Sequence, residues 1–400
     1  MTVRYVDLFA GCGGISLGLQ KAGLQGLFAV EKNPDAFSTL KYNLIDTHKH
    51  FKWPQWLPVK NWNIDTLLKN EESDLKSLQG KVDLVVGGPP CQGFSLVGER
   101  RATDKRNRLI HSYLKFVELV KPRVIMFENV YGFTVKFSNA KRNGKRAYSE
   151  IVISKLHELG YTDARGEIID MSEFGVPQRR KRFIVIATRD GFADKIFKNL
   201  FDGRNEFLKS NGLPAKATTY HALSDLESKH GMDACPDTNG FMSGVSSKAK
   251  TNLQKYLRIP GKETYMPDSH RFVNHTEDAE KVFSYLLEEA PRNKRIMGEA
   301  RAEYGIKKRN VTVLDPEQPS LTITTIPDDF VHYSEPRVMT VRECARLQTF
   351  PDWFEFKGPY TTGGPRRVKQ TPRYTQVGNA VPPLFAEQVG LAIKRTLGKE

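Results

Sequence analysis

Short apolar runs alternate with segments of helical periodicity through the first 190 residues, and this alternation constrains the fold of the 400-residue chain more than any other feature. Six apolar runs read as strands: residues 5–9, 27–31, 82–86, 124–128, 166–170 and 182–188. Between two of them, apolar side chains recur at helical spacing over residues 109–120. Strands that alternate with helices are typical of βαβ units. We therefore expect an α/β fold with a doubly wound, mostly parallel sheet.

The alternation stops near residue 190 and regular signals return only near the end. Residues 191–336 are rich in Gly, Asn, Ser, Pro and Lys and have little periodicity. A capping box then opens at Thr340, and a final amphipathic helix is expected over residues 385–397. We predict a catalytic and cofactor-binding domain at 1–190, a smaller irregular inserted domain at 191–336, and a return segment at 337–400 that completes the first domain.

Charge narrows the class of partner. The chain has 61 Lys and Arg against 46 Asp and Glu, a net charge of +15, and no apolar run reaches membrane-spanning length. Basic residues cluster at 136–146, 292–309 and 366–373. Such a chain most often binds polyanions, which favours nucleic acid. The four cysteines are too far apart for a zinc site, and no signal peptide is visible, so we expect reduced thiols, no metal and a cytoplasmic protein.

One cysteine occupies a position suited to chemistry. Residues 87–95 read Gly-Gly-Pro-Pro-Cys-Gln-Gly-Phe-Ser and follow the predicted strand 82–86. Cys91 therefore lies on a turn beyond the carboxyl end of a strand, where open α/β sheets bind ligands. We interpret Cys91 as a candidate nucleophile; the alternative is a small buried apolar side chain.

A glycine-rich turn suggests a cofactor site. Residues 7–14, Asp-Leu-Phe-Ala-Gly-Cys-Gly-Gly, join the first strand to a helix, and their glycines let a ligand approach the backbone closely. Ser16 stands where a dinucleotide fingerprint has its third glycine, which argues against a pyrophosphate ligand. Glu31 ends the second strand, where a carboxylate accepts from ribose hydroxyls.

Two further side chains indicate which nucleoside is bound. Asp65 precedes a short helix and can accept from an adenine amino group. Recognition of ribose and adenine without a phosphate cradle indicates S-adenosylmethionine, with Phe9 as a cation–π partner for its sulfonium.

Charged residues flank the predicted strands near Cys91. Glu128 ends the strand 124–128 and would share a sheet edge with Cys91, although a strand-end glutamate is often only a cap or a surface charge. Residues 178–182, Gln-Arg-Arg-Lys-Arg, carry four positive charges to the start of a buried strand. Such a placement is costly unless an anion or polar ligand meets the charges.

Together these segments resemble the DNA (cytosine-5) methyltransferase family of the prokaryotic restriction-modification type. The matching segments are residues 7–14, Glu31, and residues 87–95, 106–109, 128–130, 178–182, 342–351 and 376–383. The resemblance implies an S-adenosylmethionine-dependent methyltransferase sheet, with residues 191–336 in the place of the target-recognition domain. It also implies methyl transfer to C5 of a flipped-out cytosine within a specific double-stranded DNA sequence, which protects host DNA from a cognate restriction endonuclease.

The resemblance assigns roles residue by residue. Cys91 would add to cytosine C6, Glu128 would act at N3, Arg182 would contact O2, and Arg180 would support the same pocket. The implied cofactor residues are Phe9, Gly11, Cys12, Gly13, Glu31, Asp65, Pro90, Leu109 and Asn379. Residues 93–108 are predicted to form a basic mobile lid. Its expected DNA contacts are Ser95, Arg100, Arg101, Lys105 and Arg106.

Two alternatives have the same fold. A tRNA-methylating relative typically has threonine where Ser95 stands, and a catalytically inactive DNA-binding relative would have lost Cys91, Glu128 or Arg182. We therefore expect an active monomeric enzyme, prokaryotic or phage-encoded. Its partner is double-stranded DNA, and the endonuclease acts on the same site without direct contact.

Overall fold

The structure, a computed structural model, describes residues 2–90, 108–135, 147–306, 310–361, 366 and 369–398. The chain packs as two compact units. The first unit comprises Met1–Asp170, Lys181–Arg204 and Ala386–Glu400; the second comprises Met171–Arg180 and Asn205–Phe385. The predicted division at residues 190 and 336 concerns function, which packing alone does not test, so it stays a prediction.

A six-stranded sheet forms the centre of the first unit in the described residues, in the order β2-β1-β3-β4-β6-β5. The strands are β1 (Arg4–Leu8), β2 (Gln25–Val30), β3 (Leu84–Gly87), β4 (Val124–Val130), β5 (Asp163–Asp170) and β6 (Lys181–Thr188). The sheet is parallel except for β6, which is antiparallel to β4 and to β5. The predicted α/β fold with a mostly parallel sheet is confirmed, and each predicted strand is present.

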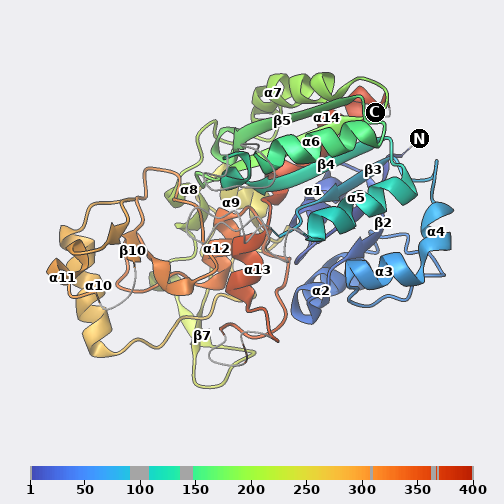
Figure 1. Ribbon diagram of the computed structural model, residues 1–400. Coiled ribbons are helices and arrows are strands. Elements are labelled where there is room, and N and C mark those ends of the chain that lie inside the picture. Colours follow the sequence, from blue (N-terminus) through green and yellow to red (C-terminus); the bar gives the residue numbers. More distant parts are fainter. Residues whose placement is uncertain are drawn as a thin grey trace. The chain divides into compact units, whose positions relative to one another are not determined.

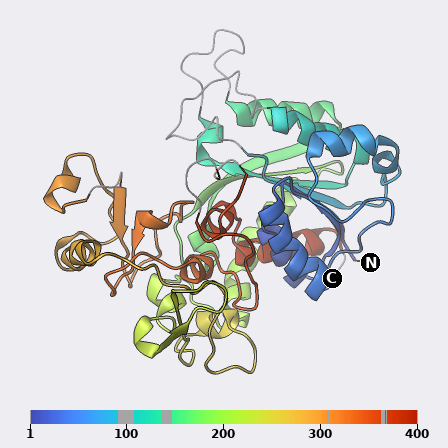
Figure 2. The ribbon, with the colours of Figure 1, turned by 90° about the horizontal axis from the view of Figure 1, so that it is seen from below.

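Helices cover both faces of this sheet. They are α1 (Gly14–Lys21), α2 (Pro34–Leu40), α3 (Ile64–Asn70), α4 (Glu72–Lys76), α5 (Arg108–Val120), α6 (Tyr148–Glu158), α7 (Ala193–Ser210) and α14 (Pro383–Thr396), and a π-helix, Lys41–Thr47, follows α2. Figures 1 and 2 show α5 and α6 on one face of the sheet and α1 and α14 on the other. The connection between α2 and α3 adds to the core, because Trp53 and Trp56 pack edge-on against Phe28 of β2 at centroid distances of 6.2 and 6.0 Å.

The second unit has short elements, as the weak periodicity predicts. Its helices are α8 (Thr219–Leu223), α9 (Asn252–Leu257), α10 (Glu277–Glu289), α11 (Ala300–Glu303), α12 (Val341–Leu347) and α13 (Arg373–Asn379). Its strands are β7 (Met232–Ala234), β8 (Met242–Gly244), β9 (Ile296–Met297), β10 (Asn310–Val313) and β11 (Phe330–Val331). β7 and β8 form a hairpin, and β11-β10-β9 form a small sheet whose apolar side chains pack against α10. The predicted capping box is present: Thr340 Oγ1 accepts from Glu343 N and Glu343 accepts from Thr340 N.

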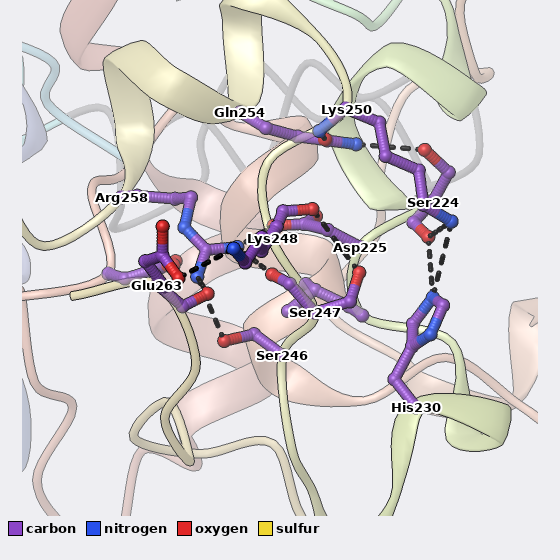
Figure 3. Close-up of polar contacts among 12 residues, drawn as sticks. Ser224, Asp225, His230, Ser246, Ser247, Lys248, Lys250, Gln254, Arg258 and Glu263 are labelled. Atoms are coloured by element: carbon purple, nitrogen blue, oxygen red, sulfur yellow. Dashed lines mark hydrogen bonds and ion pairs between the residues drawn. The ribbon is translucent and has the colours of Figure 1, made fainter.

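Buried ion pairs supply much of the interior of the second unit. Arg258 Nη1 lies 2.8 Å from Asp225 Oδ2 (Figure 3), and Arg346 joins Asp225 to Asp352 at 3.2 and 2.6 Å. Figure 3 also shows the Gln254 amide donating to Ser224 Oγ beside this pair. Since each charged group is paired, the network acts as a scaffold rather than as a reactive site. Within the described ranges, every helix is too short or too polar to span a bilayer.

Candidate active site

The carboxyl ends of β3 and β4 bring Glu128 next to the segment that leads to Cys91. The two strands are parallel, with Gly87 opposite Phe127, so their ends share one edge of the sheet. A Cβ on Gly88 would lie 2.8 Å from Glu128 Oε2, so the glycine leaves room for the carboxylate where it now lies. Cys91 itself lies outside the described residues.

Asn129 fixes the proline turn at this edge. Its side-chain amide donates to the carbonyl of Pro89 at 3.3 Å, and Asn129 is buried. The turn is therefore tied to β4 immediately before Cys91. Gly88 and Asn129 belong to segments that carry the family resemblance, but neither was predicted as a site residue; the signal available was their position beside Pro89 and Glu128.

Arg182 pairs with Glu128 because β6 runs antiparallel to β4. This direction brings the first residues of β6 to the carboxyl edge of β4, where Arg182 lies opposite Val130. Arg182 Nε is 3.0 Å from Glu128 Oε1, and each side chain is 13% exposed. The positive charge of Arg182 at the start of β6 is thus paired with the Glu128 carboxylate. Because both side chains are partly exposed, the pair remains accessible to a polar ligand.

Arg180, predicted for the same pocket, belongs to the second unit. It is 1% exposed, and its Nη2 donates to the carbonyl of Gly378 at 3.0 Å. Gln178, two residues earlier, accepts from Ile323 N and donates to Gln348 Oε1 at 2.9 and 3.0 Å. Both side chains form hydrogen bonds to groups of the second unit. The role of Arg180 toward a substrate stays a prediction.

The glycine turn after β1 has the backbone expected of a ligand cradle. Phe9, Gly11 and Gly13 have positive φ values of 58°, 56° and 96°. This conformation is unfavourable for an aromatic residue, by an order of 1–3 kcal/mol, and such strain gathers at functional sites. A Cβ on Gly11 would meet nothing within 4 Å, so space lies beside this glycine.

Glu31 is built into the same turn. Its Oε2 accepts from Gly11 N at 3.0 Å and its Oε1 from Asn33 N at 2.7 Å. Burial raises the pKa of Glu31, and the two backbone bonds oppose that rise. Each carboxylate oxygen keeps a lone pair for another donor, as a ribose diol requires. The carboxylate therefore fits the predicted cofactor.

Asp7 is the penultimate residue of β1 and precedes the glycine turn. It is fully buried; its Oδ2 accepts from Ser16 Oγ at 2.6 Å, while its Oδ1 has no hydrogen-bond partner among the residues that the structure describes. Burial raises the pKa of Asp7 to about 7, which the hydrogen bond from Ser16 partly opposes and the nearby Glu31 increases. Asp7 thus connects the turn to α1 through Ser16, and its burial disfavours the charged form of its carboxyl group.

Asp65 has partners besides the predicted adenine. Its carboxylate accepts from Arg108 Nη2 at 3.0 Å and from Ser112 Oγ, both on α5. A carboxylate has further lone pairs, so an adenine amino group remains a possible donor. Leu109 is partly exposed and Pro90 is exposed, whereas Asn379 is an exposed residue of the second unit. These cofactor assignments stay predictions.

The described cysteines are poor nucleophiles. Cys12, Cys235 and Cys344 are all buried. Burial raises the pKa of Cys12 to about 12 and that of Cys344 even further, and the Cys235 thiol donates to Asp237. Cys91 is therefore the remaining candidate. The predicted DNA contacts Ser95, Arg100, Arg101, Lys105 and Arg106 lie outside the described residues, in which no cluster of metal-ligating side chains occurs.

The mostly parallel six-stranded sheet with helices on both faces is consistent with the class-I methyltransferase fold. The chain matches the family model for C-5 cytosine-specific DNA methylases over residues 3–395 and belongs to that family. It is a DNA cytosine-5 methyltransferase of the restriction-modification type, which confirms the predicted family.

Individual relatives agree with this membership. The chain is 31% identical to the type II methyltransferase M.PspPI of a Psychrobacter species, over 98% of this chain and 79% of the relative. It is 29% identical to the type II methyltransferase M.XorII of Xanthomonas oryzae, over 99% and 85%. A putative DNA modification methyltransferase encoded within an Escherichia coli prophage has a similar fold, with a TM-score of 0.65, 23% identity and coverage of 99% and 100%.

Proposed function

We propose that this chain transfers a methyl group from S-adenosylmethionine to C5 of a flipped-out cytosine in a specific double-stranded DNA sequence, through a covalent bond between Cys91 and cytosine C6. The observation that carries the proposal is the Glu128–Arg182 pair, at 3.0 Å, on the edge where β3 leads to Cys91. This edge offers an acid and a cation, and the chain leads from it directly to Cys91.

The chemistry explains why these groups are needed together. Cytosine C5 is a weak nucleophile while its ring is aromatic, and addition of the Cys91 thiolate to C6 makes C5 enamine-like. Glu128 supplies a proton or a hydrogen bond to N3 as charge develops there, and Arg182 donates to O2. Their mutual ion pair holds both groups in place before the base arrives.

The bound cofactor supplies an electrophilic methyl group on a sulfonium. This methyl would be the group that C5 receives, with the neutral thioether of the cofactor as the leaving group. The C5 proton then leaves to water, the Cys91 sulfur departs from C6 as a thiolate, and a proton that N3 has accepted returns to Glu128, which restores the aromatic ring. Glu31 would hold the ribose, and the strained turn of Phe9 and Gly11 would bring backbone and ring close to the rest of the cofactor.

Access to C5 requires that the cytosine leave the duplex, at a cost of roughly a few kcal/mol. The basic residues predicted for this step, from Arg100 to Arg106, precede α5. We propose that residues 191–336 select the target sequence, and that the methylation protects host DNA from an endonuclease with the same target. A monomeric cytoplasmic enzyme, bacterial or phage-encoded, fits this role.

A covalent trap tests the nucleophile. DNA that carries 5-fluorocytosine in the target cannot lose fluorine as a proton, so a protein–DNA adduct that resists denaturation should accumulate. Cys91→Ser should form no adduct, whereas the matched control Cys235→Ser should form it in full yield, because Cys235 is buried in the second unit. An adduct of unchanged yield in Cys91→Ser would contradict the assignment.

A further inference from the structure

Arg271 lies over two aromatic rings in the second unit. Its Cζ is 4.0 Å from the centroid of Phe241 and 3.8 Å from that of Tyr360. Contacts this short with two rings restrict the plane of the guanidinium. Arg271 therefore differs from a flexible surface arginine, whose long side chain samples many rotamers.

The backbone around Arg271 is held as well. The segment pairs with β8: Gly244 N donates to His270 O at 3.0 Å and Phe272 N donates to Met242 O at 2.8 Å. An isolated antiparallel bridge between Ser243 and Arg271 thus joins the segment that carries Arg271 to the hairpin of β7 and β8. Both main chain and side chain are preorganised.

In the part of the chain that the structure describes, the Arg271 guanidinium nevertheless has no hydrogen-bond acceptor. Its Nε is buried without a hydrogen-bond partner, and no described residue forms a hydrogen bond or an ion pair with its guanidinium. Arg373, which lies against the same Tyr360 ring at 4.2 Å, differs in this respect: it donates to Gly358 O and pairs with Asp237 at 2.9 and 2.7 Å. Burial of a guanidinium N–H without a hydrogen-bond acceptor costs free energy. This cost points to a ligand that supplies acceptors to Arg271.

We propose that Arg271 is a specificity-determining residue that donates two hydrogen bonds to O6 and N7 of a guanine in the target DNA. The inference rests on the proposed function and names a residue that reads the sequence. The planar fork of arginine matches this pair of acceptors, which the major groove exposes only at guanine. Contacts to DNA phosphates position a protein on the duplex but do not require a guanidinium held in one plane. Exposed basic residues such as Arg295 are sufficient for such contacts.

The test compares variants on defined duplexes. Bisulfite sequencing of DNA from a host that expresses the unaltered chain gives the target. Methylation rates are then measured with purified protein on the target and on duplexes in which each guanine in turn is replaced by 7-deazaguanine or by adenine. At one guanine, either replacement should slow the unaltered enzyme by roughly 10- to 100-fold.

Two variants of Arg271 sharpen the test. Arg271→Met keeps an extended side chain over the rings but has no donors, so it should methylate the native and 7-deazaguanine duplexes equally well at that position. Arg271→Gln should shift its preference from guanine toward adenine there, because a glutamine amide matches the adenine edge. Arg295→Ala, an exposed arginine of the same unit, is the matched control and should keep the discrimination of the unaltered enzyme. Thermal unfolding verifies that each variant is folded, and Arg271→Gln decides the matter if Arg271→Met is not.

Each contrary outcome has its own signature. Undiminished discrimination at every guanine in both Arg271 variants would overturn the inference while the enzyme's function stands. An equal loss of binding to all duplexes, with a weaker salt dependence, would make Arg271 a phosphate contact and also overturn it. If the unaltered chain methylates no DNA, the proposed function is contradicted, and the assignment of Arg271 is contradicted with it.

Discussion

The two units use arginine–carboxylate pairs in opposite ways. In the first unit, Glu128 and Arg182 meet at the edge of the sheet, and each is 13% exposed. In the second unit, Arg346 lies between Asp225 and Asp352, and all three side chains are fully buried. A pair that still meets solvent can exchange a bond with its partner for a bond to a substrate. A buried pair cannot do so without leaving a charge in the interior, so exposure separates the reactive pair from the scaffold.

The pKa values of buried carboxyl groups also differ between the two units. In the first unit, burial raises the pKa of Asp7 to about 7, because no cation faces it closely enough to outweigh desolvation. In the second unit, burial alone would raise the pKa of Glu343, but the bidentate contact with Arg337 outweighs it and holds that pKa far below its usual range. Asp7 of the first unit is therefore a buried acid without a balancing cation beside the predicted cofactor site, whereas the charge of Glu343 in the second unit is balanced by Arg337.

The largest expected effect concerns the exposed pair. Glu128→Gln keeps the shape of the side chain but removes the acid, so the methylation rate should fall by something like 10²–10⁴-fold. The affinity for DNA should change little, since the residue acts at the base during the reaction. Single-turnover kinetics and a DNA-binding titration measure the two quantities separately. Equal losses of rate and affinity would make Glu128 a binding or structural residue and remove the contrast with the buried pairs.

The next effect concerns the scaffold. Asp352→Asn leaves the buried Arg346 with one of its two carboxylates, and the free energy of unfolding should fall by about 3–5 kcal/mol. Urea-induced unfolding followed by circular dichroism measures this change. At a temperature where the variant stays folded, its methylation rate should match that of the unaltered enzyme. A stable but inactive variant would place catalysis, rather than support, in this network.

A smaller, pH-dependent effect is expected at Asp7. Between about pH 4 and pH 7 the folded chain holds a proton on Asp7 that the unfolded chain has lost, so the stability contributed by this group falls as pH rises. Asp7→Asn removes this dependence. The free energy of unfolding of the variant, relative to the unaltered enzyme, should therefore rise across that window, by at most about 1.4 kcal/mol per pH unit. A difference that stays constant from pH 4 to pH 7 would show that Asp7 does not titrate there.

Glu343 should behave in the opposite sense. Its pKa is lowered in the fold, so its stabilisation is present above the unfolded value near 4.5 and is lost as pH falls. Glu343→Gln should therefore be most destabilising near neutrality and progressively less so in acid. If both variants show the same sign of pH dependence, the electrostatic contrast between the units is wrong.

The smallest effect is expected on the surface of α5. Lys115 and Glu118 form an ion pair at 2.9 Å with both side chains 51% exposed. Lys115→Ala should change the free energy of unfolding by less than about 0.5 kcal/mol, because solvent and salt screen the pair. The same urea titration measures it. A loss of several kcal/mol would mean that exposure does not rank these pairs as proposed.

The first unit was predictable in detail because its periodicity is local. Apart from β5, which is mostly polar, the strands from β1 to β6 contain short apolar runs, and Gly87–Gly88 and Glu31 are visible from their neighbours in the sequence. The direction of β6 was not visible, since an apolar run reads the same in both directions. That direction decides that Arg182 meets Glu128.

The structure of the second unit was hard to predict because ion pairs and hydrogen bonds between residues far apart in the sequence stabilise it. Arg346 and Asp225 are 121 residues apart, and Tyr360 and Asp237 are 123 residues apart. No sequence spacing indicates such pairs. The bond from the buried Arg180 to the carbonyl of Gly378, 198 residues away, likewise leaves no mark in the local pattern.

The path of the chain between the units has a consequence for enzyme engineering. The chain passes from one unit to the other at four places, after Asp170, Arg180, Arg204 and Phe385, and the short segment Met171–Arg180 packs with the second unit. An exchange of residues 205–385 alone would leave the buried Gln178 facing foreign groups in place of Ile323 and Gln348. A graft that retargets this enzyme should therefore transfer two pieces of chain, 171–180 and 205–385, with the sheet of the recipient left intact between them.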